Sequence, residues 1–257
     1  MKIRSLKMLS LVLALAFVLS AVPSKSVSAS KASKPTISLG TNGINEGTSM
    51  HYIKSNISRG MLTAYIGNTK KTGHLTITIS GRKIKDITLF DKMGVGSGFK
   101  VLSLPSLEAG YYTVTAVYDQ VNVETAEKQI SIRVYDGKAY AFCEQASKAF
   151  DRLEGDTRLY SYAVDLSTGI ASGKDIIKRI AGSHSTLKSN KMLVIDAWVE
   201  SLYKGILGRD SDPSGKQFWI NKIVSGNYKD TVYEEIFNEF LHTDEFKGRM
   251  ESLGYNW

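Results

Sequence analysis

The residues of this chain that could carry out chemistry are four histidines, one cysteine and scattered carboxylates. No two of the histidines, at positions 51, 74, 184 and 242, stand at the spacing that zinc ligands require. Cys143 lacks the local sequence of a thiol protease, although His184, 41 residues later, leaves a Cys/His dyad open. The sequence also lacks serine-hydrolase, phosphate-binding and dinucleotide-binding motifs. We therefore expect neither a catalytic centre nor a cofactor.

The most specific group of oxygen-bearing side chains is the turn from Asp210 to Gly215. Asp210, Asp212 and Ser214 stand at positions 1, 3 and 5 of a calcium-loop pattern, with glycine at position 6. Position 12 is Asn221, where such a loop needs a bidentate glutamate. We expect Asp212 to cap a helix by accepting backbone N–H groups. The alternative is a weak calcium site formed by Asp210, Asp212, Ser214 and Asn221.

The elements that must position this turn are helices. Apolar residues recur on one helical face over residues 195–207, and Gly208 ends that pattern. Asp212 followed by Pro213 begins a second helix, in which Trp219 lies on the apolar face. Apolar pairs four residues apart predict a third helix over residues 232–241. The region 138–257 is therefore predicted to be a helical domain.

Residues 199–246 carry a succession of short motifs: Leu-Tyr, Leu-Gly-Arg, Asp-Pro-x-Gly, Trp and Thr-x-Glu-Phe. This succession resembles the bacterial domain of unknown function 4214. The resemblance implies a helical fold and an exported, surface-layer or polysaccharide-associated protein, and it implies no settled activity. We assign structural roles to the matching residues, which are Arg209, Asp212, Pro213, Gly215 and Trp219.

A degenerate duplication is a further possibility for the helical region, at an offset of 57 residues. Apolar residues, one arginine and one glycine agree at this offset. The agreeing pairs are Phe142/Val199, Phe150/Leu207, Arg152/Arg209, Tyr162/Trp219, Leu166/Ile223 and Gly169/Gly226. Chance agreement between two helical stretches leaves the alternative open that the two halves are unrelated.

The region 35–136 alternates between apolar and polar residues with the period of β-strands. Seven such segments separated by turns predict a two-sheet sandwich. They are Thr36–Leu39, Leu62–Ile66, Leu75–Ile79, Ile87–Phe90, Phe99–Leu104, Tyr111–Tyr118 and Gln129–Val134.

The run from Leu107 to Tyr112 resembles the corner that opens the penultimate strand of immunoglobulin-like sandwiches. That resemblance implies that the hydroxyl of Tyr112 bonds back to the backbone, which makes Tyr112 a structural residue. The predicted fold class is therefore multidomain: an all-β immunoglobulin-like sandwich followed by an all-α helical domain.

Residues 1–29 have the features of a cleavable export signal. Basic residues precede an apolar run over residues 8–22, and small residues follow it. The run is shorter than the ~20 apolar residues that span a bilayer, so we expect no stable membrane insertion after cleavage. Residues 30–34 then form a short linker. The mature protein is expected to be secreted, with possible non-covalent attachment to the cell surface.

The charge of the chain excludes a nucleic-acid partner, because no stripe of Lys and Arg gathers on one element. Residues 30–136 hold 13 basic and 8 acidic residues, whereas residues 137–257 hold 16 and 17. Tyr65, Tyr111 and the turns Lys70-Lys71 and Arg82-Lys83 are candidates for a glycan- or polymer-binding face. With one cysteine the chain forms no internal disulfide, and we expect Cys143 to be a small apolar residue.

These observations favour a non-catalytic secreted or cell-surface protein that binds a glycan or another surface protein. One alternative is a secreted enzyme or enzyme accessory that acts on extracellular polysaccharide. Another is a structural surface protein that associates with itself.

Overall fold

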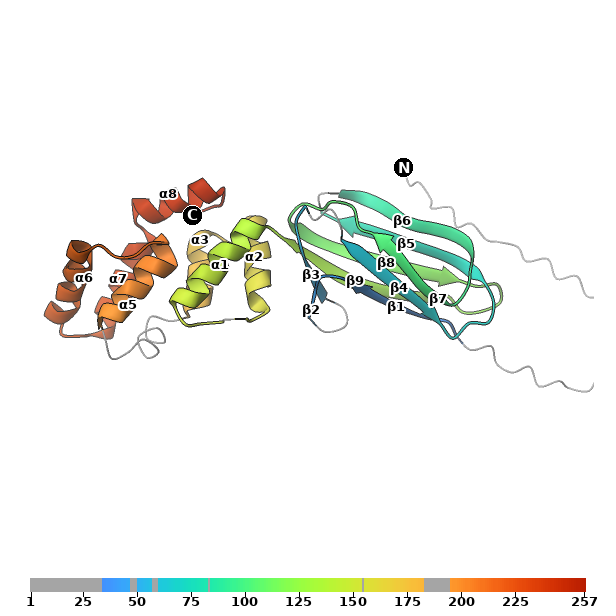
Figure 1. Cartoon of the computed structure of the whole chain (residues 1–257), viewed down its shortest axis with the longest axis horizontal. Coiled ribbons are helices and arrows are strands. Elements are labelled where there is room, and N and C mark those ends of the chain that lie inside the picture. Colours follow the sequence, from blue (N-terminus) through green and yellow to red (C-terminus); the bar gives the residue numbers. More distant parts are fainter. Residues whose placement is uncertain (1–33, 47–49, 57–59, 83, 154, 183–194) are drawn as a thin grey trace, which may run out of the picture. The chain divides into compact units, whose positions relative to one another are not determined.

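The computed structural model describes residues 34–46, 50–56, 60–82, 84–153, 155–182 and 195–257 (Figure 1). The predicted export signal lies outside these residues. The strands are β1 (Thr36–Thr41), β2 (Ile44–Glu46), β3 (Met50–Lys54), β4 (Met61–Gly67), β5 (Gly73–Gly81), β6 (Ile84–Val95), β7 (Gly98–Ser103), β8 (Gly110–Asp119) and β9 (Ala126–Tyr135). The helices are α1 (Gly137–Ala149), α2 (Arg158–Ser167), α3 (Gly173–Ala181), α5 (Ile195–Leu202), η1 (Tyr203–Leu207), α6 (Pro213–Ser225), α7 (Asp230–Leu241) and α8 (Asp244–Leu253).

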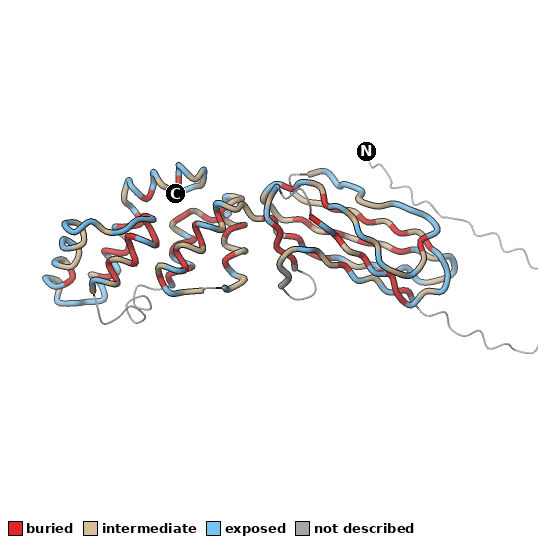
Figure 2. The backbone as a smooth tube through the Cα atoms, viewed as in Figure 1, coloured by how far each residue is buried: buried red, intermediate tan, exposed pale blue. Residues whose placement is uncertain are grey.

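The strands form two sheets with a hydrophobic core between them. The order is β1-β4-β7 in a three-stranded sheet and β2-β3-β9-β8-β5-β6 in a six-stranded sheet. Leu62 and Ile66 of β4 enter the same core as Ile77 of β5 and Ile132 of β9. Because side chains alternate across a strand, every second residue is buried, as the alternating colours in Figure 2 show. The residues between them face outward.

The helices share a second core, which contains buried residues from α1 to α8. Side chains that accept backbone N–H groups set the starts of several of these helices. Asp136 caps α1 through Lys138, Ser172 and Asp175 form a capping box on α3, and Thr243 caps α8. Among the described residues, no helix combines the length and apolar character needed to cross a membrane.

The helix that begins with α5 ends in one π-helical turn, η1. The N–H of Gly208 donates to the carbonyl of Tyr203 at 2.8 Å, and Gly208 has φ +80°, a left-handed conformation that favours glycine. Arg249 of α8 donates to the carbonyl of Ile206 at 2.6 Å and to Oε1 of Gln145 at 2.5 Å. A side chain on Gly208 would meet the Arg249 guanidinium at 2.7 Å. Arg249 therefore closes the carbonyl end of η1, which a π-turn leaves open.

Four tyrosines gather where the last strand meets the helices. The ring of Tyr160 in α2 lies 5.6 Å from that of Tyr52 in β3, 5.2 Å from Tyr135 in β9 and 4.6 Å from Tyr140 in α1. Beside them, Nη1 of Arg133 donates to Oγ of Ser161 at 3.1 Å. These contacts join β3 and β9 to α1 and α2 through packed aromatic area.

The predicted fold class must be corrected. A sandwich region over residues 36–135 is followed by a helical region over residues 137–253, but they are not separate domains. Residues 33–257 form a single compact unit, and the tyrosine contacts are the physical reason. The sandwich also departs from an all-antiparallel immunoglobulin-like plan, because β3 pairs with β9 in parallel.

The helix bounds follow the offset of 57 residues on which the predicted duplication rests. Shifted by that number, α1 falls on α5 and η1, α2 on α6, and α3 on α7, while the segment that would correspond to α8, residues 187–196, lies mostly outside the described residues. The order and approximate positions of three helical segments thus agree between the two halves, although α2 and α3 have 10 and 9 residues against 13 and 12 in α6 and α7. Duplication stays a prediction that this agreement supports.

Candidate functional site

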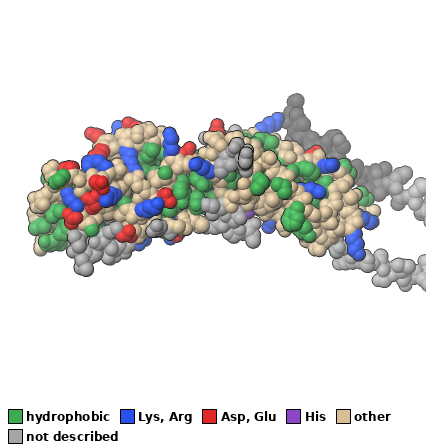
Figure 3. Space-filling view, in the orientation of Figure 1, with side chains coloured by type: hydrophobic (Ala, Val, Ile, Leu, Met, Phe, Trp, Pro, Cys, Tyr) green, Lys and Arg blue, Asp and Glu red, His purple; other side chains and the backbone are tan. Residues whose placement is uncertain are grey.

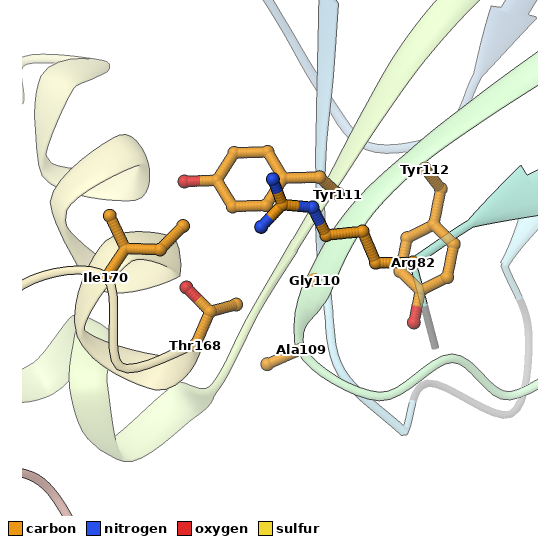
Figure 4. A pocket seen from close by; sticks show the side chains of 7 residues that line it. All are labelled: Arg82, Ala109, Gly110, Tyr111, Tyr112, Thr168 and Ile170. Carbon is orange, nitrogen blue, oxygen red and sulfur yellow. The ribbon is translucent and has the colours of Figure 1, made fainter. Parts of the chain in front are cut away.

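A small cavity of about 120 Å³ lies between the start of β8 and the end of α2. Arg82 and Tyr111 line it from the strand side, and Thr168 and Ile170 lie on the opposite side (Figure 4). The backbone of Ala109 and Gly110 forms part of the wall. The cavity has room for a small polar group, and its charged side chain is an arginine.

A shallow hollow of about 440 Å³ continues from this cavity over the outer face of the six-stranded sheet. The two share Arg82, Tyr111 and Tyr112. The outward side chains of the continuation are Thr113 of β8 and Ser131 and Arg133 of β9. We call this continuous surface the arginine groove, defined by Arg82, Tyr111, Thr113, Ser131 and Arg133.

Strand register explains why these residues meet. In β8 and β9 the alternation places Tyr112 and Ile132 in the core, so their neighbours face outward. Tyr111 stands directly opposite Arg133, and Thr113 stands opposite Ser131. Cross-strand pairs of this kind lie close enough for their side chains to interact. The groove is thus built on regular strands rather than on loops, with the exception of Arg82 in the turn after β5.

The groove carries positive charge. The guanidinium of Arg133 lies 5.5 Å from the centroid of the Tyr111 ring, which is a cation–π distance. The same guanidinium donates one hydrogen bond to Ser161. Arg82 is exposed and has no carboxylate partner among the described residues. The described residues that line the groove include no Asp or Glu. An anion could therefore meet two guanidinium groups without repulsion from the lining.

The Tyr111 side chain is held in place by a polar chain behind it. Its hydroxyl donates to Asp165 of α2, and Nη1 of Arg179 contacts the other oxygen of Asp165 at 2.6 Å. Burial, reinforced by the Asp165 carboxylate, raises the pKa of Tyr111 well above its usual value. Tyr111 therefore stays protonated at physiological pH. It offers a fixed aromatic surface, not a base.

Tyr112, the residue predicted to be structural, points into the sandwich. Its hydroxyl donates to the carbonyl of Glu108 at 2.9 Å, four residues upstream, and burial raises the pKa of Tyr112. Of the other candidates for a binding face, Tyr65 lies on β4 of the opposite sheet, and Lys70-Lys71 lies in the turn before β5. Lys83 lies outside the described residues.

The structural residues of the helical motif hold one turn together. Arg209 pairs with Glu245, with Nη2 to Oε2 at 2.9 Å, and lies 4.9 Å from the centroid of the Tyr203 ring. Trp219 packs on the ring of Phe240 at 5.0 Å. Pro213 is the first residue of α6, and the N–H of Gly215 donates to Asp212 at 2.7 Å. The motif thus fixes the turn against α7 and α8.

The calcium candidates are engaged elsewhere. Asp210 pairs with Nζ of Lys204 at 3.0 Å, and Asn221 accepts from Gln217 at 2.9 Å. Ser214 donates to Asp212 at 2.8 Å, so the capping carboxylate has a second partner. Within the described ranges, no group of three His, Cys, Asp or Glu side chains could hold a metal.

Replacing Asp212 with alanine tests the cap against the calcium site. The carboxylate accepts the N–H of Gly215, and this bond lowers the pKa of Asp212, so its loss should destabilise the start of α6. We expect the melting temperature to fall by a few degrees, equally with and without millimolar calcium. A calcium-dependent rise in the wild-type melting temperature, lost in Asp210→Ala, would contradict the cap assignment.

The remaining chemical candidates do not form a site. Cys143 is fully buried in α1, and burial raises the pKa of its thiol. His184 lies outside the described residues. His74 pairs with Asp91, and Nδ1 of His242 contacts the carbonyl of Asn238. Sequence reasoning missed Arg133, although its alternation with the buried Ile132 could have placed it on the outer face.

Residues 180–250 match the family model described as "Domain of unknown function (DUF4214)". The resemblance predicted from residues 199–246 is thereby confirmed. The immunoglobulin-like resemblance of residues 35–136 has no support from a family model. No curated protein matches the chain.

Solved structures resemble the chain only weakly. A superoxide reductase (neelaredoxin) from Ignicoccus hospitalis shares 12% identity over 43% of this chain and 86% of its own, with a TM-score of 0.30. CopC from Methylosinus trichosporium OB3b is 13% identical over 39% of this chain and 95% of its own, with a TM-score of 0.28. The catalytic domain of an LPMO from Listeria monocytogenes is 11% identical over 35% of this chain and 63% of its own, with a TM-score of 0.26. Scores this low assign no activity, and the DUF4214 match is limited to residues 180–250 of the 257.

Proposed function

We propose that this protein is a non-catalytic extracellular binding protein whose arginine groove holds an acidic polysaccharide. The observation that carries the proposal is the pairing of two guanidinium groups with an acid-free lining. Arginine presents a planar fork of donors that matches a carboxylate in two-point contact. The predicted export signal supports an extracellular ligand.

The other residues of the groove suit a sugar polymer. Thr113 and Ser131 offer hydroxyl groups along the sheet, and the Tyr111 ring offers an apolar surface beside Arg133. The hollow is shallow and lies on the outer face of the sheet, so a chain-like ligand can enter it from solvent. In the face drawn in Figure 3, acidic side chains gather over the helical region, which leaves the sandwich as the more favourable surface for an anion.

Binding to polygalacturonate oligomers tests the proposal. We expect Arg82→Ala to weaken binding roughly tenfold, because one charge-assisted contact of about 1.4 kcal/mol is lost. Arg133→Ala should have at least this effect, and its melting temperature must be checked, since Arg133 also bonds Ser161. Binding should also weaken as salt is raised. Isothermal titration calorimetry on the mature protein measures these changes.

Two controls separate the groove from general charge attraction. Arg158→Ala removes the same charge from an exposed arginine that pairs with Asp156 outside the groove, and it should leave the affinity unchanged. Methyl-esterified polygalacturonate keeps the sugar backbone without the carboxylates and should not bind in the groove. Equal losses in Arg82→Ala and Arg158→Ala, or unchanged binding of the ester, would refute the proposal.

A further inference from the structure

The outer face of the three-stranded sheet carries a pair of exposed aromatic rings. Tyr65 of β4 stands directly opposite Phe99 of β7, and their ring centroids lie 4.7 Å apart at an interplanar angle of 46°. Phe99 is 72% exposed and Tyr65 is 40% exposed. On the same face, Val101 is 63% exposed and Met61 is 44% exposed. Contiguous apolar side chains on a surface commonly mark a binding site.

This face carries no charge at its described outward positions. We call it the aromatic platform, and its outward residues are Thr36, Ser38, Met61, Thr63, Tyr65, Phe99, Val101 and Ser103. The alternation of β1 and β4 sends Leu39, Leu62 and Ala64 into the core instead. The platform therefore combines apolar rings with hydroxyl groups in a chain that is 23% charged overall. A charged ligand would find no counter-charge there.

The size of the platform decides between classes of partner. Three strands about 4.8 Å apart and six residues at about 3.4 Å each give a surface of roughly 300 Å². A stable protein–protein interface buries about 800 Å² on each partner. The platform is thus too small to hold a second copy of the chain or another folded protein by itself. It is large enough for a short oligosaccharide.

We infer that the aromatic platform binds a neutral oligosaccharide by stacking sugar rings on Phe99 and Tyr65. The C–H face of a hexose carries partial positive charge, which the negative face of an aromatic ring attracts. Ser38 stands directly opposite Tyr65, and Thr63 lies two residues along β4, where its hydroxyl donates to the carbonyl of Gly40 and keeps acceptor capacity. Both hydroxyl groups can exchange hydrogen bonds with sugar hydroxyls. This site lies on the sheet that does not carry the arginine groove. The inference is therefore independent of the proposed acidic ligand.

Titration of the mature protein with cellohexaose, mannohexaose and chitohexaose tests the inference. We expect at least one to bind, with amide shift changes concentrated in β4 and β7. Phe99→Ala should weaken that binding at least tenfold, and Tyr65→Ala several-fold. Phe99 is exposed, so the variant should keep the wild-type melting temperature.

Matched controls decide the outcome. Phe218→Ala removes a phenylalanine that is 60% exposed on α6 and should leave neutral-sugar binding intact. Arg82→Ala should also leave it intact, so failure of the groove and failure of the platform are distinguishable. The inference is overturned if none of the three sugars shifts β4 and β7. It is equally overturned if the wild type dimerises with concentration and Phe99→Ala abolishes the dimer, since the occupant would then be a second copy.

Discussion

Replacing Arg249 with alanine is expected to lower the free energy of unfolding by about 3–4 kcal/mol. The half-buried guanidinium closes η1 by donating to the carbonyl of Ile206, bonds Gln145 and lies 5.0 Å from the centroid of the Phe142 ring. Truncation leaves two acceptors without their donor and removes the packing on Phe142. Urea unfolding followed by circular dichroism measures the change.

Two further variants separate the role of this arginine from that of its charge. Arg249→Lys keeps the charge but loses the planar fork that reaches both acceptors, so we expect most of the loss to remain. Arg158→Ala, which removes an exposed arginine at the first position of α2, should show no measurable loss. A similar stability for Arg249→Ala and the wild type would show that η1 does not need this support.

Gly205→Ala is expected to destabilise the protein by about 3 kcal/mol. Alanine normally stabilises a helical position relative to glycine by up to about 1 kcal/mol. Here a Cβ would lie 2.4 Å from the ring of Phe150, which is fully buried and cannot move aside without repacking the core. The steric cost therefore exceeds the gain in helix propensity. Thermal unfolding shows directly whether Gly205→Ala raises or lowers the stability.

Gly248 in α8 provides the matched control. A Cβ there meets nothing within 4 Å, so Gly248→Ala should stabilise the protein by up to about 1 kcal/mol. Combining Gly205→Ala with Phe150→Leu should cost less than the two single changes together, because the smaller side chain makes room. Strict additivity of the two changes would place the cause of the loss elsewhere.

The features that the sequence could predict are those set by neighbouring residues. Alternation in β5, β8 and β9 predicted strands because one face of each is buried. The start of α6 was readable from Asp212 and Pro213, whose cap needs only the next few residues. By contrast, β3 was missed because three consecutive residues in it are buried, which hides the period of two.

The features that the sequence could not predict depend on distant partners. Nothing local to Tyr135 shows that its ring packs on Tyr160, so the strands and helices were wrongly predicted to be separate domains. The arginine groove also depends on residues far apart in the sequence, because the register of β8 and β9 is what brings Arg133 opposite Tyr111. The turn η1 was read as ordinary helix, since α- and π-helical turns place apolar residues on nearly the same face.

The tyrosines at the junction give the chain an optical signal of its own. Four phenol rings with centroid distances of 4.6–5.6 Å are close enough for coupled electronic transitions, which appear in near-ultraviolet circular dichroism. All three tryptophans, at positions 198, 219 and 257, belong to the helical region. Tryptophan emission therefore reports on the helices alone, while the contribution of these four rings to the tyrosine band depends on the attachment of the helices to the strands. The two signals together can show, without any label, whether the junction opens before the helices unfold.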